Sequence, residues 1–189
     1  MEHYYTSIHY CKWRGVICNP KNHGRVTAIN LANQGLSGPI AACVGNLTFL
    51  HTLDLSSNQF SGQIPNLNNL QKMQILDLST NSLNGTIPDT LTNCSNLKEL
   101  HLYTNLLDGA IPQEIGSLTN LVFLGLSHNN LIGNIPPTVG NITHLENLYL
   151  GYNQLEGSIP DELGQFLNIS IMDLPANKLS GSIPESIFN

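Results

Sequence analysis

The sequence carries little charge, and that scarcity excludes several classes of partner. Its 189 residues include 7 Lys and Arg and 13 Asp and Glu, which gives a net charge of 7 − 13 = −6. Because no basic stripe is present, nucleic acid and anionic membrane surfaces are not expected as main partners. No run of about 18 or more apolar residues predicts a membrane span. The first residues, MEHYYTSIHY, lack the basic region and apolar run of a signal peptide.

The sequence also lacks the motifs that mark catalytic sites. It contains no nucleophile elbow, no H-E-x-x-H zinc motif, no phosphate-binding glycine loop and none of the protein-kinase signatures. Its seven histidines are scattered, and no set of carboxylates or cysteines joins them in a metal-site pattern. We therefore expect no enzyme activity, no cofactor and no metal site in this chain.

What the sequence does contain is a repeat of about 24 residues. Residues 118–136 read L-x-x-L-x-x-L-x-L-x-x-N-x-L-x-G-x-I-P, and the same frame recurs before and after them. Counted from Gln34 in the first copy, the asparagines are separated by 24, 23, 24, 24, 24 and 24 residues. A fixed period of this kind is the signature of a solenoid. These asparagines are Asn58, Asn81, Asn105, Asn129, Asn153 and Asn177.

The residue types within one repeat predict its local structure. The L-x-L segment, such as residues 124–126, predicts a short strand whose two leucines point inward. The asparagine is expected to turn inward and to hydrogen-bond backbone groups where the chain leaves the strand. Gly133 and its equivalents are expected to adopt unusual dihedrals, and the Ile-Pro pair to begin an extended segment. One repeat cannot bury its leucines alone, so stacked neighbours share one continuous core.

The repeat tail resembles that of the plant extracellular leucine-rich repeat, whose mark is L-x-G-x-I-P. It occurs here as FSGQIP, LNGTIP, LDGAIP, LIGNIP, LEGSIP and LSGSIP, and the first copy, LSGPIA, has lost its proline. The resemblance implies an α/β solenoid, a right-handed leucine-rich-repeat superhelix of about seven repeats. It further implies short parallel strands on the concave face, loops and 3-10 turns on the convex face, and a second small sheet formed by the repeat tails.

Residues 11–18, CKWRGVIC, resemble the end of the N-terminal cap of plant leucine-rich-repeat receptors, which reads C-x-W-x-G-V-x-C. The resemblance implies a disulfide between Cys11 and Cys18, with Trp13 covering the first leucines; the alternative is two free thiols in a cytosolic protein. We therefore divide the chain into a partial N-terminal cap, residues 1–25, and leucine-rich repeats, residues 26–189, with an uncapped C-terminal end.

The other two cysteines, Cys43 and Cys94, lie 51 residues apart. Two repeats separate them by about 10 Å or more, which exceeds the roughly 7 Å Cα limit for a disulfide. Cys94 takes a position that leucine holds in other repeats and is expected to be a buried apolar residue. The third repeat is one residue short near residues 66–69, and we expect this deletion on the convex side.

Five N-x-S/T sequons predict glycosylation and passage through the secretory pathway. Three of them share one repeat phase, with separations of 47 and 48 residues, and none lies in an L-x-L segment. If glycosylated, those three form a stripe on one flank or on the convex side. The alternative is that an asparagine-rich sequence produces sequons by chance or copies them with the repeat. The sequons are at Asn46, Asn84, Asn93, Asn141 and Asn168, of which the first, third and fourth share the phase.

The repeat frame also identifies outward positions around each strand: the residue between the strand leucines, the residues two before and two after it, and the next residue. Repeats two and three carry small and polar residues there, whereas repeats four to six carry large aromatic ones, which are typical anchors of recognition surfaces. The alternative is surface aromatics that pack on one another between strands. The predicted concave ligand-binding residues are Glu99, His101, Tyr103, Phe123, His128, Asn147, Tyr149 and Tyr152.

Two further readings of these positions concern chemistry. Asp54 and Asp77 occupy equivalent places in adjacent repeats, as an acid–base pair would, but an open and shallow face makes catalysis there unexpected. His101 and His128 could be neighbours across repeats, yet no carboxylate or cysteine set completes a metal site with them.

The whole pattern resembles the ectodomains of plant leucine-rich-repeat receptor-like kinases, and the run GNLTFLHTLDLSSNQFSGQIP resembles their immune-receptor subfamily. That subfamily includes the flagellin and elongation-factor receptors and the rice bacterial-blight resistance receptor. The resemblance implies a fragment that binds a peptide or protein ligand, including pathogen-derived ones, together with a co-receptor leucine-rich-repeat kinase, in innate immune signalling.

The same resemblance implies that the parent receptor lies at the extracellular face of the plasma membrane. Its membrane span and serine/threonine kinase domain are not present in this chain. Two alternatives are a secreted inhibitor of a pathogen enzyme, of the polygalacturonase-inhibitor type, and a truncated product without function.

Overall fold

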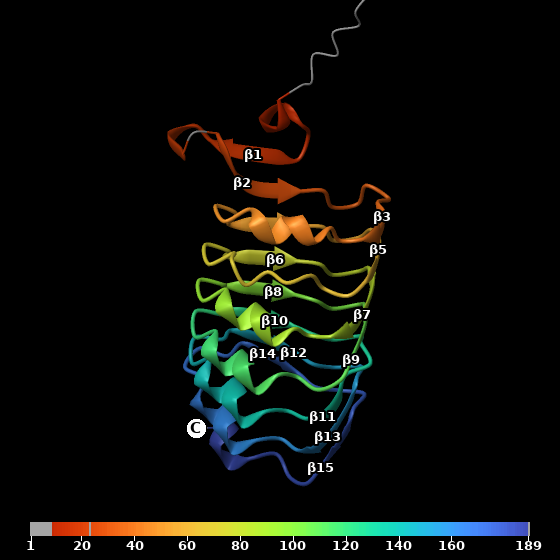
Figure 1. Cartoon of the computed structure of the whole chain (residues 1–189). Helices are drawn as coiled ribbons and strands as arrows, with labels where there is room; N and C mark the ends of the chain where they lie inside the picture. Colours follow the sequence, from red (N-terminus) through yellow and green to blue (C-terminus); the bar gives the residue numbers. More distant parts are fainter. Residues whose placement is uncertain (1–8, 23, 189) are drawn as a thin grey trace, which may run out of the picture.

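The L-x-L segments of the repeats form one long sheet. The computed structural model describes residues 9–22 and 24–188. The first two strands of this main sheet pair antiparallel, and every later strand is parallel to its neighbour. The strands stack as rungs in Figure 1. In sheet order they are β1 (Val16–Asn19), β2 (Arg25–Asn30), β4 (Thr52–Asp54), β6 (Ile75–Asp77), β8 (Glu99–His101), β10 (Phe123–Gly125), β12 (Asn147–Tyr149) and β14 (Ile171–Asp173).

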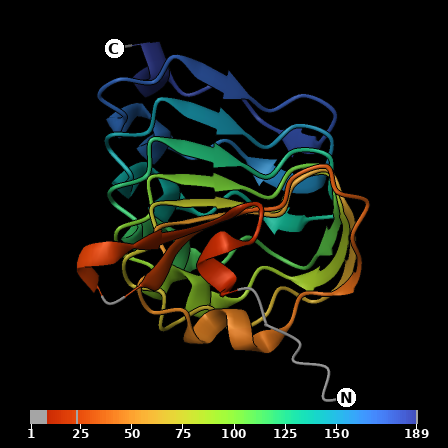
Figure 2. The same ribbon diagram turned by 90° about the horizontal axis from the view of Figure 1, so that it is seen from above.

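The repeat tails form a second row of parallel strands on a different side of the coil (Figure 2). The row is interrupted between the fourth and fifth tails, where a single bridge joins Ala110 and Ile132. The second small sheet implied by the resemblance is therefore present, in two parts. The first part is β3 (Ser37–Pro39), β5 (Gln59–Gly62), β7 (Ser82–Thr86) and β9 (Leu106–Asp108); the second is β11 (Ile132–Asn134), β13 (Gln154–Ser158) and β15 (Lys178–Ser180).

Short 3-10 turns complete the repeats, and proline sets where several of them begin. Pro88, Pro112, Pro136 and Pro160 each precede a turn with an extended ψ between 131° and 138°, as the fixed φ of proline favours. Residues 63–74 contain no such turn, so the one-residue deletion near residues 66–69 removes it from the third repeat. The turns are η1 (Tyr10–Lys12), η2 (Pro20–Asn22), η3 (Ala42–Asn46), η4 (Asp89–Asn93), η5 (Gln113–Ser117), η6 (Pro137–Asn141), η7 (Asp161–Gln165) and η8 (Glu185–Phe188).

The leucines of successive repeats form one continuous core. Leu124 and Leu126, which flank the outward Gly125, are fully buried, as the period-2 alternation of a strand predicts. Cys94 is equally buried in this core and takes the place of a leucine, as its position in the repeat predicts.

The N-terminal end of the core is covered differently from the expectation. Trp13 is 59% exposed, so it does not bury itself over the first leucines. The antiparallel pairing of β1 with β2 covers that end instead. Trp13 lines an apolar cavity of about 320 Å³ together with Val16, Val26 and Ile29.

The repeated asparagines turn inward and connect each repeat to its neighbours. Asn129 is 8% exposed, and its Nδ2 donates to the carbonyl oxygens of Leu102 and Leu126, both at 3.0 Å. Its Oδ1 accepts the N–H of Leu107 at 3.0 Å. The same bonds recur at Asn105 and Asn153, so the asparagine ladder satisfies backbone groups that burial would otherwise leave unpaired.

Gln34 occupies the first place of this ladder but does not perform the same task. Its side chain is exposed, and within the described residues its Nε2 donates only inside its own turn, to Ala32 and Asn33. The longer glutamine chain thus ends the ladder at its N-terminal limit.

The residue before each ladder position has a left-handed backbone. Gly133 and its equivalents also have positive φ, as predicted, but this second row consists of residues with side chains, at φ 53° to 56°. Left-handed φ is uncommon in such residues and costs the most for Thr. The row is Asn33, Ser57, Thr80, Thr104, His128, Tyr152 and Ala176.

Replacing Asn129 by Ala should lower the free energy of unfolding by about 2–4 kcal/mol, because buried carbonyl and amide groups lose their partners. The matched change Gln34→Ala should lower it by less than about 0.5 kcal/mol, since Gln34 is exposed. Urea unfolding followed by far-UV circular dichroism measures both. An equal loss of unfolding free energy in the two variants would contradict the conclusion that the buried asparagine ladder stabilises the fold.

Candidate ligand-binding surface

Four ring side chains gather over β8, β10 and β12 on the outer side of the main sheet. We call His101, Tyr103, Phe123 and Tyr149 the strand ring cluster. The ring centroids of His101 and Phe123 lie 4.2 Å apart in a stacked arrangement, and those of Phe123 and Tyr149 lie 5.4 Å apart. Tyr103 meets His101 edge-on at 6.1 Å. Such geometries stabilise aromatic pairs beyond the area they bury.

The cluster depends on a residue that has no side chain. A Cβ on Gly125 would lie 2.8 Å from Cε1 of Phe123 and 3.1 Å from Cδ1 of Tyr103. Gly125 is in register with His101 on one side and Tyr149 on the other, so it leaves room for the rings of adjacent repeats. The sequence already shows that Gly125 is the one glycine between two strand leucines. That this glycine makes room for the rings can be recognised only once the positions of the rings are known.

Two more rings form a separate pair where the strands end. His128 and Tyr152 stack with centroids 4.2 Å apart and planes inclined by 9°. Both stand in the left-handed row, at φ 54° and 55°, and both are exposed, Tyr152 by 53%. We call them the exit ring pair. His101 and His128 therefore stack on different rings, Phe123 and Tyr152 respectively, rather than on each other.

The polar members of the predicted surface lie beside the strand ring cluster. Nε2 of His101 is 3.1 Å from Oε2 of Glu99, and the two side chains are 16% and 44% exposed. The Nδ1 atom of His101 is buried and has no hydrogen-bond partner in the described part of the chain. Asn147 is half-buried on β12, in register with Phe123. His101 is thus more enclosed than an outward strand position predicts, because Phe123 covers it.

The outward carboxylates of the second and third repeats are also neighbours. Asp54 and Asp77 are in register on β4 and β6. Oδ1 of Asp54 accepts from Oγ of Ser56 at 2.7 Å, and Oδ1 of Asp77 accepts from Oγ of Ser79 at 2.6 Å. These bonds fix the direction of both carboxylates along the open face of the sheet.

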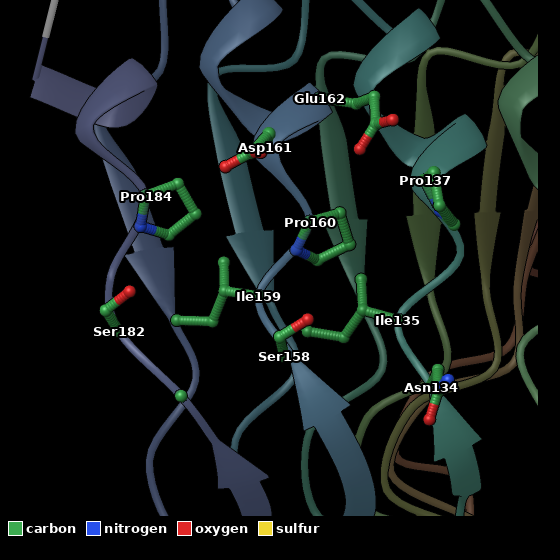
Figure 3. A pocket seen from close by; sticks show the side chains of 11 residues that line it. Asn134, Ile135, Pro137, Ser158, Ile159, Pro160, Asp161, Glu162, Ser182 and Pro184 are labelled. Carbon is green, nitrogen blue, oxygen red and sulfur yellow. The ribbon is translucent and has the colours of Figure 1, made fainter.

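A cavity elsewhere on the molecule has a different character. It has a volume of about 510 Å³ and lies between the repeat tails and the turns η6 to η8 (Figure 3). Equivalent residues of successive repeats line it, such as Ile135 with Ile159 and Pro160 with Pro184. Its acidic members, Asp161 and Glu162, begin η7. None of the predicted ligand-binding residues lines it.

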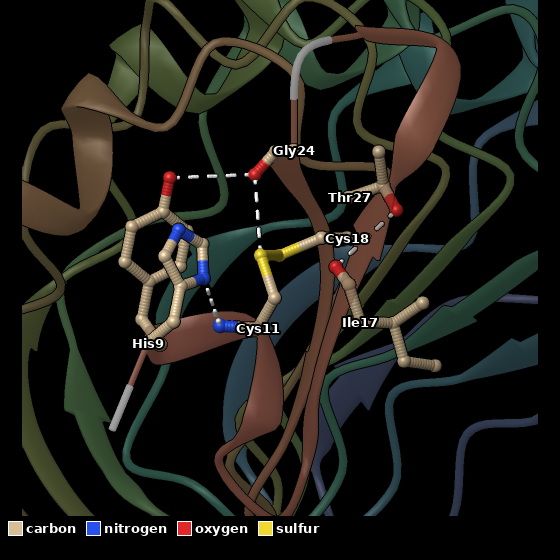
Figure 4. The surroundings of a disulfide bond; sticks show 7 residues. His9, Cys11, Ile17, Cys18, Gly24 and Thr27 are labelled. Carbon is tan, nitrogen blue, oxygen red and sulfur yellow. Dashed lines mark hydrogen bonds between the residues drawn. A yellow bond between two sulfur atoms is a disulfide. The ribbon is translucent and has the colours of Figure 1, made fainter.

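The cap cysteines are joined in the structure. Cys11 and Cys18 form a disulfide with a Cα–Cα distance of 5.5 Å, which links η1 to β1 (Figure 4). Sγ of Cys11 lies 3.3 Å from the carbonyl oxygen of Gly24, and the hydroxyl of Tyr10 donates to the same oxygen at 3.4 Å. The disulfide therefore ties η1 to β1, while the contacts with Gly24 place η1 beside the chain that enters β2.

All five sequon asparagines are exposed and lie outside the strands of the main sheet. Asn46, Asn93 and Asn141 are the last residues of the turns η3, η4 and η6. Asn84 lies in β7, and Asn168 lies between η7 and β14. Glycans at these positions would leave the outer side of the main sheet uncovered.

The two remaining cysteines differ in environment. Cys43 is exposed, whereas Cys94 is buried, and burial raises the pKa of the Cys94 thiol to about 11. No helix in the described residues is long and apolar enough to cross a membrane.

Thiol alkylation at mildly alkaline pH should place one label on the folded chain, at Cys43. The raised pKa keeps Cys94 protonated as well as inaccessible, so its label should appear only after unfolding. Labels at Cys11 and Cys18 should require a reductant. Mass spectrometry of peptides counts the labels, and rapid labelling of Cys94 in the folded chain would show that its repeat opens readily.

Comparison with known proteins places these features in a family. A family model described as Leucine rich repeat matches residues 71–131, and a second with the same description matches residues 49–70 and 144–166. Phytosulfokine receptor 1 of Arabidopsis thaliana is 40% identical over 70 residues, which are 35% of this chain and 7% of that receptor. Matches to curated relatives of this kind span only 5 to 7% of the relatives' length.

Solved structures cover much more of the chain. The ectodomain of the Arabidopsis receptor kinase GASSHO1/SCHENGEN3, in complex with CASPARIAN STRIP INTEGRITY FACTOR 2, superposes with a TM-score of 0.93 at 40% identity, over 95% of this chain and 22% of that one. Pollen Receptor Kinase 3 gives 0.81 at 33% identity, over 92% and 84%. Arabidopsis HAESA, in complex with the peptide hormone IDA and the co-receptor SERK1, gives 0.68 at 29% identity, over 97% and 39%.

Proposed function

Because the chain belongs to the leucine-rich-repeat family, in the group formed by plant receptor-kinase ectodomains, we propose that it binds a peptide or protein ligand. The observation that carries this proposal is the gathering of rings at outward positions of β8, β10 and β12. Partly exposed aromatic side chains on a rigid sheet lose little freedom on binding, which makes them effective anchors.

The bound relatives support a peptide as the ligand and a second receptor as a further partner. HAESA is seen with a peptide hormone and with the co-receptor SERK1, and GASSHO1/SCHENGEN3 with an integrity factor. By analogy, this chain contributes part of a recognition surface that a co-receptor leucine-rich-repeat kinase completes. The proposed ligand contacts are Glu99, His101, Tyr103, Phe123, His128, Asn147, Tyr149 and Tyr152.

The finer assignment is to innate immune signalling, with pathogen-derived ligands, at the extracellular face of the plasma membrane. It is supported by the resemblance of residues 45–65 to the immune-receptor subfamily, and by the cap disulfide and exposed sequons, which suit an oxidising compartment. We assign residues 1–25 to the cap and residues 26–189 to the repeats, since the antiparallel β1 precedes the first repeated strand.

Replacing Tyr103, Tyr149 and Tyr152 together by Ala should weaken ligand binding at least about 30-fold, the effect of losing about 2 kcal/mol of contact energy. The test uses secreted protein and the peptides that it recovers from a random-peptide display library. The control replaces Leu106 and Ile132 by Ala. Both are about half exposed, but they lie in β9 and β11, which belong to the sheets of the repeat tails and not to the main sheet. If the folded triple variant binds these peptides with unchanged affinity, the proposal is wrong.

Expression through a plant or insect secretory pathway should attach glycans to the exposed sequons. Intact mass before and after enzymatic deglycosylation measures them, and peptide mapping should find Asn46, Asn93 and Asn141 modified. These asparagines end 3-10 turns and are open to the transferase. A secreted chain without glycans would contradict the assignment of these residues as glycosylation sites.

A further inference from the structure

The open face of the main sheet carries two like charges side by side. Asp54 and Asp77 are in register on adjacent parallel strands, which lie about 4.8 Å apart. Like charges directly opposite one another destabilise a sheet. The pairing is therefore unfavourable in the free chain and becomes favourable when a cation lies between the two carboxylates.

Both carboxylates are held in place by the chain itself. The N–H and hydroxyl groups of Ser56 donate to Oδ1 of Asp54, and those of Ser79 donate to Oδ1 of Asp77. Asn30 donates to Oδ2 of Asp54 at 3.0 Å. The second oxygen of Asp77 receives no hydrogen bond from the described residues. These donors orient the carboxylates without neutralising them.

In the described part of the chain, no Lys or Arg forms an ion pair with Asp54 or Asp77. The outward positions of the seven repeats hold Asp54, Asp77, Glu99 and Asp173, but no Lys or Arg. Arg14 lines a cavity with Asn30 and Ala32 at the N-terminal edge of this face, whereas two other basic residues lie away from it. Nζ of Lys72 lies 3.9 Å from the ring centroid of Phe49, which is not one of the outward residues. Lys178 in β15 donates to Gln154 in β13, within the sheets of the repeat tails.

The carboxylate pair adjoins the strand ring cluster without a gap. Asp77 is in register with His101 on β8, and Phe123 stacks on His101 from β10. Two strand spacings, about 10 Å, separate Asp77 from Phe123, a distance that about three residues of an extended peptide span. Rings also attract cations through their faces, so the two halves of the surface favour the same kind of ligand.

We propose that the concave face takes a basic, extended peptide, with a Lys or Arg side chain on Asp54 and Asp77 and a neighbouring aromatic side chain on the strand ring cluster. This inference rests on the proposed function. It adds the chemical class of the peptide and the strands on which its basic and aromatic side chains lie. Arg suits the pair best, because its planar guanidinium can donate to two carboxylates at once. An acidic peptide is repelled by four carboxylates of this face, none of which forms an ion pair with a Lys or Arg among the described residues.

The experiment sequences the peptides that the secreted protein recovers from the display library, and compares three proteins. The double variant Asp54→Asn, Asp77→Asn keeps the size of both side chains and removes their charge. The control, Asp89→Asn with Asp161→Asn, removes the same charge from exposed residues that begin η4 and η7. Circular dichroism and urea unfolding establish that each variant is folded.

Peptides recovered by the wild type should be enriched in Arg or Lys about three residues from an aromatic residue. Their affinity should fall about tenfold in the double variant, as expected for a lost charged contact, should stay unchanged in the control, and should weaken with added salt. Recovery without basic enrichment, or equal affinity in the double variant, would overturn the inference and leave the proposed function standing if the tyrosine variant still loses binding. Recovery that ignores the tyrosines, or no recovery at all, would overturn both.

Discussion

Each amide of the asparagine ladder hydrogen-bonds to two repeats at once, and the rest of the structure depends on that constraint. Nδ2 of Asn153 donates to the carbonyl of Leu150 in its own repeat and to that of Leu126 in the preceding repeat. Its Oδ1 accepts from Leu131 of the preceding repeat. Because these bonds tolerate no slip, the strands are held in register, and equivalent side chains lie one strand spacing apart.

Because the register is fixed, the position of a residue in the repeat determines where its side chain lies on the surface of the sheet. A residue at an outward position has its counterparts from the adjacent repeats as nearest neighbours, so charges and rings at equivalent positions accumulate as columns. Asp54 meets Asp77, and Asp77 meets His101, with no loop between them. The leucines and asparagines fix the backbone, and the outward residues are free to specify a ligand without affecting the core.

The period and residue types predict the strand positions, the inward leucines, the buried Cys94 and the inward asparagines, since each follows from local chemistry repeated at a fixed interval. The second small sheet was expected from the family resemblance alone. The role of Trp13 was predicted wrongly, because the pairing of β1 with β2 depends on where an irregular segment folds back. The left-handed row was not predicted either. Its members share no residue type, and tertiary packing overrides the preference of residues such as Thr104.

The candidate surface, too, could be predicted from the sequence only in part. Sequence alone places the rings at outward positions, but it cannot decide whether they stand free or pack together, and the structure shows that they pack, in one cluster and one pair. His101 is largely covered by Phe123, while Tyr152 remains about half exposed. Packing between rings does not argue against recognition, since it holds the exposed edges rigid before a ligand arrives. Rigid, partly exposed rings beside oriented carboxylates are therefore better suited to selecting a ligand than mobile side chains would be.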